Sequence, residues 1–111
     1  ADADKAFAEA IGQDNWEGFK ALRACQHVRA TALAKAGATS QNEDYRLAAL
    51  WLEAMVAVDQ RDTKSADALY QDVVKQDPDI DTVQQASMAT DKAVLDLRTE
   101  RRELGLPSCR N

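Results

Sequence analysis

Aromatic residues, proline and glycine are all scarce in this chain of 111 residues. Aromatics make up 5% of the sequence, and there are only two prolines and four glycines. A β-sheet protein would carry more turn signals, and most of these glycines and prolines fall where helical patterns break. The core must therefore be built mainly from Leu, Val and the 21 alanines, whose small side chains let helices approach closely. These features predict an all-α fold.

A basic surface and a long apolar run are also lacking. The chain has 14 basic against 19 acidic residues, for a net charge of −5. Nucleic-acid binders show a dense basic face, so we expect no nucleic-acid partner. No stretch of about 18 apolar residues occurs, so no membrane span is predicted. The length is close to the commonest domain size, which favours a single helical domain over residues 1–111.

Catalytic and ligand-binding motifs are absent from the sequence. The lone histidine, His27, has no metal-ligand partners at helical spacing, and there is neither a Gly-x-Ser-x-Gly elbow nor a glycine-rich phosphate loop. Asp77, Asp79 and Asp81 alternate like the start of an EF-hand loop, but the required glycine and final glutamate are missing. We therefore predict no enzyme activity, no metal and no cofactor.

Apolar spacing and capping residues predict five helices. They run from Asp2 to Ile11, Asp14 to Ala36, Ser40 to Val58, Asp62 to Gln76 and Asp81 to Leu104. The first residue of each of the last four is the expected N-cap. The acidic turn that starts at Asp59 is explained by helix capping, and the mixed-charge run from Arg98 to Glu103 is interpreted as a solvated face, with a partner site as the alternative.

The two cysteines, Cys25 and Cys109, lie far apart without Cys-x-x-Cys spacing. This placement favours one disulfide in an oxidising compartment, and the alternative is a buried helical thiol plus a tail thiol. The chain starts at Ala1 without an initiator methionine, as a mature protein does after removal of a signal peptide, although a trimmed chain would look the same. We therefore expect a periplasmic or secreted protein.

Aromatic and neighbouring apolar residues are the best candidates for partner binding, because Trp and Tyr are enriched at the centres of interfaces. Trp16 and Phe19 lie in the first turns of the second predicted helix. Trp51 lies with Leu47 and Val58 on a second apolar stripe of the central helix. We expect the first helix to cover this stripe and to be displaced by an amphipathic helix of a partner. Ordinary core packing is the alternative for each residue.

The segment 44–78 resembles a tetratricopeptide repeat hairpin. The small, aromatic and closing proline positions of the repeat match Ala54, Ala66, Tyr70 and Pro78. The match departs from the family at Ala57, where a large residue is expected, and no second copy follows although a solenoid needs about three. The resemblance implies one repeat-like hairpin within a compact bundle of four to five antiparallel helices. It also implies peptide binding in a concave groove.

In size, helical pattern and cysteine placement the chain is similar to the secretin pilotins of type II secretion. This family consists of small exported helical proteins in which a disulfide ties an internal helix to the C-terminal region. The resemblance implies a non-enzymatic module that grips a helical segment of a secretion component. A pilotin is often lipidated at an N-terminal cysteine, which this sequence does not show. An inhibitor or immunity protein that blocks a toxin or hydrolase, and a small helical ligand carrier, are the alternatives.

Overall fold

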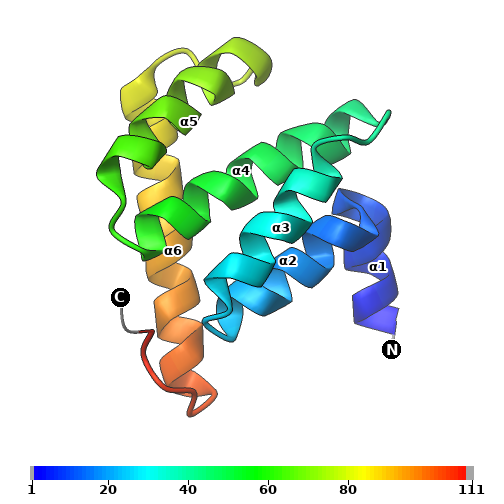
Figure 1. Cartoon of the computed structure of the whole chain (residues 1–111), viewed down its shortest axis with the longest axis vertical. Helices are drawn as coiled ribbons and strands as arrows, with labels where there is room; N and C mark the ends of the chain where they lie inside the picture. The colour runs from blue at the N-terminus through cyan, green and yellow to red at the C-terminus, as the bar shows by residue number, and fades with distance from the viewer. Residues whose placement is uncertain (1, 110–111) are drawn as a thin grey trace.

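The computed structural model describes residues 2–109, which form six helices and no strand (Figure 1). The helices are α1 (Asp2–Ile11), α2 (Gln13–Arg23), α3 (His27–Gly37), α4 (Glu43–Asp59), α5 (Thr63–Gln76) and α6 (Val83–Glu103). The predicted all-α fold is confirmed. None of the described helices is long and apolar enough to cross a membrane.

The single long helix predicted from Asp14 to Ala36 is wrong, because the chain turns between α2 and α3. Cys25 has a φ of 63° there. Its N–H donates to the carbonyl of Leu22, and the N–H of the next residue donates to Ala21. This pair of bonds is a Schellman motif, whose left-handed position is usually glycine. A cysteine at that position conceals the break, and so the described residues form six helices where five are predicted.

The helix N-caps agree with the sequence only in part. Asp62 caps α5 as predicted, since its side chain accepts a hydrogen bond from the N–H of Ser65. The N-cap of α4 is Asn42, two residues after the predicted Ser40, and that of α6 is Thr82, one residue after the predicted Asp81. α2 begins without a side-chain cap. Neighbouring Ser, Thr, Asn and Asp residues have nearly equal cap preferences, so tertiary packing selects among them.

Helices that follow one another along the chain pack side by side, and α6 also crosses α4 to reach α2 (Figure 1). One core cluster joins α2, α3, α4 and α6, and a second joins α4, α5 and α6. Val58 of α4 packs against both clusters. The central helix is therefore covered on two faces, as its two apolar stripes predict.

Small residues allow the close approach of α2, α3 and α4. A Cβ atom at Gly18 would lie 2.6 Å from a methyl group of Leu52, and one at Gly37 would collide with the buried side-chain amide of Asn15. In the α4–α5 pair, the buried alanines Ala54 and Ala66 share the second cluster with Tyr70. The resemblance of this pair to a tetratricopeptide hairpin stays a prediction.

Candidate functional site

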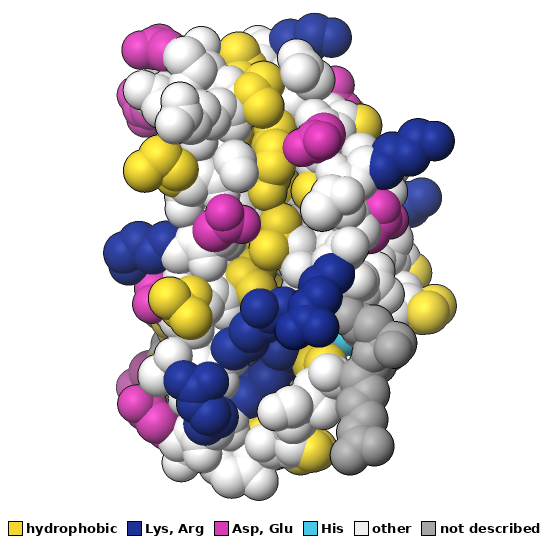
Figure 2. Space-filling view, turned by 90° about the vertical axis from the view of Figure 1, so that its left-hand side faces the viewer, with side chains coloured by type: hydrophobic (Ala, Val, Ile, Leu, Met, Phe, Trp, Pro, Cys, Tyr) yellow, Lys and Arg dark blue, Asp and Glu magenta, His cyan; other side chains and the backbone are white. Residues whose placement is uncertain are grey.

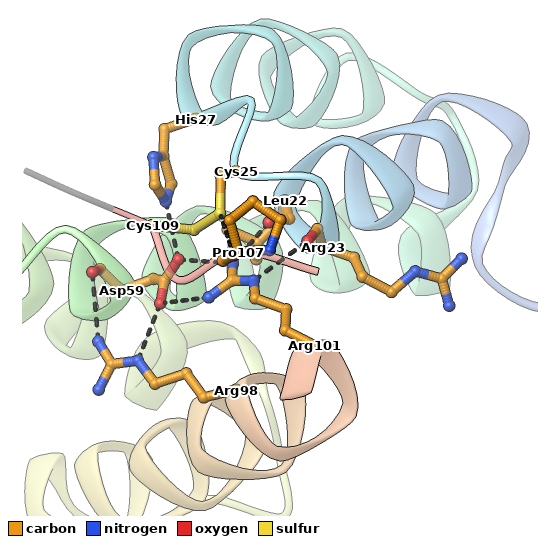
Figure 3. Close-up of a disulfide and its surroundings, with 9 residues drawn as sticks. All are labelled: Leu22, Arg23, Cys25, His27, Asp59, Arg98, Arg101, Pro107 and Cys109. Atoms are coloured by element: carbon orange, nitrogen blue, oxygen red, sulfur yellow. Dashed lines mark hydrogen bonds and ion pairs between the residues drawn. A yellow bond between two sulfur atoms is a disulfide. The ribbon is translucent and has the colours of Figure 1, made fainter. Parts of the chain in front are cut away.

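A buried carboxylate at the end of α4 organises one end of the molecule. Asp59 is only 2% exposed. Arg101 donates to both carboxylate oxygens, at 3.1 Å from Nη1 to Oδ1 and 2.7 Å from Nη2 to Oδ2 (Figure 3). Arg98 Nε donates to Oδ1 at 3.0 Å, and His27 Nε2 lies 2.7 Å from Oδ2. A single carboxylate thus joins α3, α4 and α6.

Arg101 extends this network to α2. It is 3% exposed, and its guanidinium donates to the carbonyls of Leu22 at 2.6 Å and Arg23 at 3.1 Å. Carbonyls in the last turn of a helix carry its negative dipole end, and each can accept a second hydrogen bond, so a cation is favourable there. Arg101 therefore caps α2 and neutralises Asp59 with the same side chain.

The environment of Asp59 keeps its carboxylate ionised. Burial raises the pKa, but hydrogen bonds from Arg101, His27 and Arg98 and the charge of Arg101 outweigh burial. The net result lowers the pKa of Asp59 from 3.8 to about 2. A buried charge is tolerable only when it is paired and hydrogen-bonded, and this one is. The network is part of the fold's framework.

The predicted disulfide between Cys25 and Cys109 is present, and it lies beside Asp59 (Figure 3). It ties the α2–α3 turn to the segment that follows α6. His27, Asp59 and Cys109 lie close enough together to suggest a metal site. The sulfur of Cys109 is already bonded in the disulfide, and Asp59 already accepts from two arginines. The donor set therefore fits a salt-bridge network better than a metal ion.

A pocket of about 150 Å³ opens over this network, and we call it the arginine pocket. Its lining residues are Asp59, Arg61, Arg98, Arg101, Arg102, Ser108 and Cys109. Figure 2 shows the corresponding gathering of Lys and Arg side chains in the lower half of that face. The prediction of a solvated mixed-charge face is wrong at Arg101, and the capping explanation is wrong for Asp59, because both are buried in contact with each other.

A groove of about 460 Å³ runs between α5 and α6, and we call it the α5–α6 groove. Its lining residues are Val58, Arg61, Thr63, Ala66, Asp67, Tyr70, Ser87 and Asp91. The buried Ala66 and Tyr70 form its floor. Figure 2 shows hydrophobic side chains in a band that runs down this face to the basic cluster. Arg61 lines both the groove and the arginine pocket, so the two adjoin at this side chain.

An exposed apolar edge of α6 borders this groove. Met88 and Leu95 are 64% and 60% exposed, and seven-residue spacing aligns them with Arg102. Ser87 and Asp91 on the adjacent stripe of the helix face the groove. Single exposed apolar residues are ordinary, but these two stand in line beside an apolar groove. Met88 and Leu95 do not line the groove itself, but they add exposed apolar surface to the helix that forms one of its walls.

The central-helix residues predicted to bind a partner are divided between core and groove. Val58 lines the α5–α6 groove. Trp51 packs against the second core cluster, and its Nε1 donates to Asp77 at 3.1 Å. Leu47 is half-buried. Of the three residues only Val58 lines the groove, and the role of Leu47 and Trp51 in partner binding stays a prediction.

The expectation that α1 covers this stripe is wrong. α1 packs on α2 through a stack of Phe7 on Trp16, with ring centroids 4.5 Å apart. Trp16 also donates to Asp4 at 2.9 Å. Phe19 is half-buried against the first core cluster, and α1 meets α4 where the Tyr45 hydroxyl donates to a carbonyl of α1. Neither Trp16 nor Phe19 lines the α5–α6 groove.

Sequence reasoning missed Asp59, Arg61 and Arg101. The contacts of Asp59 with His27 and Arg101 join residues 32 and 42 positions apart, which no local pattern reveals. One signal was available, because an acidic residue in the last turn of a helix opposes the helix dipole and needs a compensating cation. No known protein family, curated protein or solved structure matches the chain. Any function must rest on the chemistry of these surfaces.

Proposed function

We propose that this protein is a non-enzymatic, protein-binding module that holds an amphipathic helix of a partner in the α5–α6 groove. The observation that carries the proposal is the exposed line of Met88 and Leu95 on the helix that forms one wall of a groove with an apolar floor, a groove that shares Arg61 with a basic pocket. The groove has an apolar floor, aspartates Asp67 and Asp91 in its lining and Arg61 where it adjoins the basic pocket, which matches an amphipathic helix whose acidic residue lies at the Arg61 end.

The geometry favours a helix as the occupant of the groove. A furrow between two adjacent helices has a shape that a third helix fills by ridges-into-grooves packing. Met88 and Leu95 are separated by two helical turns, which is about 10 Å along the axis. Apolar side chains of a partner helix at the same seven-residue spacing would contact both. Ala66 and Tyr70, on the floor of the groove, would contact the same apolar face of the partner helix.

The disulfide supports a location outside the cytoplasm. Cys25 and Cys109 are paired, and such bonds persist in the periplasm or outside the cell. A secretion-system accessory factor similar to a pilotin is the form of this function that we favour, because such a factor needs a helix-binding surface and no catalytic group. An inhibitor of a toxin or hydrolase, or a carrier of a small apolar ligand, would use the surface differently.

Selection of displayed helix-length peptides on the oxidised protein tests the proposal. Binding of a selected peptide, followed by fluorescence anisotropy, should weaken at least about tenfold when Met88 and Leu95 are both replaced by Gln, because buried apolar contact is lost. Val28→Gln is the matched control, since Val28 is an apolar residue of α3 that is 85% exposed. Equal peptide binding by the original protein, the double Met88 and Leu95 variant and Val28→Gln would contradict the proposal. Selection of peptides without apolar residues at helical spacing would also contradict it.

A further inference from the structure

We infer that the arginine pocket is a carboxylate-binding site that receives an acidic side chain of the segment held in the α5–α6 groove. The inference rests on the proposed function and names the chemistry of the partner's end. Of the described residues that line the pocket, four are arginines and one is acidic, although the whole chain carries a net charge of −5. A basic pocket in an acidic protein attracts an anion to one place.

Two of the pocket's arginines form ion pairs with Asp59, and the other two do not. Arg98 and Arg101 hold Asp59, and those contacts fix the pocket wall. Arg61 and Arg102 line the same pocket, and neither pairs with a carboxylate of the part of the chain that the structure describes. Arg102 donates one bond to a hydroxyl within α6 and keeps its other donors. Within residues 2–109, two guanidinium groups thus line a small pocket without forming an ion pair of their own.

A carboxylate suits these donors. A guanidinium presents two parallel N–H groups that match the two oxygens of a carboxylate, and Arg101 shows this fork on Asp59 in the same pocket. Because Arg61 lines both cavities, a helix lying along the groove can bring one end to the Arg61 side chain, which also lines the pocket. An acidic residue near that end would reach Arg61 and Arg102 without leaving the groove.

The backbone of Arg61 provides an independent reason. Its φ is 60°, in the left-handed region that glycine favours. The N–H of Arg61 donates to the carbonyl of Val58 and that of Asp62 to Ala57, which is again a Schellman motif. Arginine is a poor residue at this turn position for stability, so a role for its side chain is the natural explanation. That side chain stands at the junction of groove and pocket.

A double-mutant cycle tests the inference with a peptide selected as above. Arg102→Gln should weaken the acidic peptide about threefold to tenfold, and should change the binding of its Glu→Gln or Asp→Asn version by less than about twofold. Arg61→Gly should weaken binding of the acidic peptide by a similar factor. The urea midpoint of this variant should stay equal to or above that of the original protein. Arg29→Gln is the matched control, because Arg29 is exposed on α3 and lines neither cavity.

The outcomes separate this inference from the proposed function. One outcome is that Arg102 shows no coupling to the acidic residue of the peptide while the variant at Met88 and Leu95 still loses binding. This outcome would overturn the carboxylate site but would leave the proposed helix-binding groove standing. Equal weakening by Arg29→Gln would mean general charge attraction, and would also overturn it. Chemical-shift changes at the arginine pocket with inorganic phosphate, without coupling to the peptide, would assign the pocket to a free anion instead. Coupling confined to the pocket arginines supports the inference.

Discussion

Replacing Asp59 by alanine should be one of the most damaging single changes in this protein. The substitution removes the carboxylate that Arg98, Arg101 and His27 share. Arg101, which is 3% exposed, would then remain as a buried charge with only carbonyl partners. Loss of one partner of a buried ion pair costs about 3–5 kcal/mol. Domains of this size are stable by only about 5–15 kcal/mol, so the urea midpoint should fall sharply.

A surface ion pair is the control for this experiment. Asp96 accepts from Lys92 at 3.0 Å, but their side chains are 67% and 78% exposed. Asp96→Ala should cost less than about 0.5 kcal/mol. Adding Arg101→Met to Asp59→Ala should recover part of the lost stability, because the stranded buried charge is removed as well. If Asp59→Ala unfolds at the same urea concentration as Asp96→Ala, the account of Asp59 as the centre of the network is wrong.

The same network predicts a specific sensitivity to acid. The pKa of Asp59 is lowered from 3.8 to about 2 in the folded protein, so the folded state favours the ionised form. The stabilisation is fully present above about pH 4 and is lost as the pH falls towards about 2, and it amounts to about 2 kcal/mol. Asp59→Asn should lack this part of the acid transition. Parallel curves of stability against pH for the two proteins in that range would refute the assignment.

Three further predictions follow from particular residues. The unreduced protein should show no reactive thiol. Cys25 and Cys109 are 84 residues apart, so reduction of their disulfide should lower the free energy of unfolding by about 4–5 kcal/mol in the chain-entropy model. Urea unfolding with and without reductant measures this difference. Arg61→Gly should raise the free energy of unfolding by about 1 kcal/mol, because φ is positive there; a loss of stability would mean that its side chain has a structural role. Ala54→Leu should cost about 1–3 kcal/mol by overpacking the second cluster, whereas Ala68→Leu on the exposed face of α5 should leave the melting temperature nearly unchanged.

The sequence by itself determined the fold class and much of the helical layout. Four of the five predicted helices occur at nearly the predicted positions, because apolar spacing and cap residues act over a few residues. The end of α6 also follows from the sequence, since Gly105 stands at the left-handed position of its Schellman motif. The central place of α4 follows from its two apolar stripes. The disulfide was predictable because the chain offers only two cysteines.

Tertiary structure alone decided the break at Cys25, the burial of Asp59 and the site. At Cys25 and Arg61 a side chain other than glycine occupies the left-handed turn, so the local signal is missing and long-range contacts must support the backbone. Arginine and aspartate look the same in a sequence whether they cap an exposed helix end or form a buried pair. The difference depends on which helix ends meet, and here α2, α4 and α6 converge from positions as far as 79 residues apart. Burial and charge pairing are properties of that convergence, which local propensity does not encode.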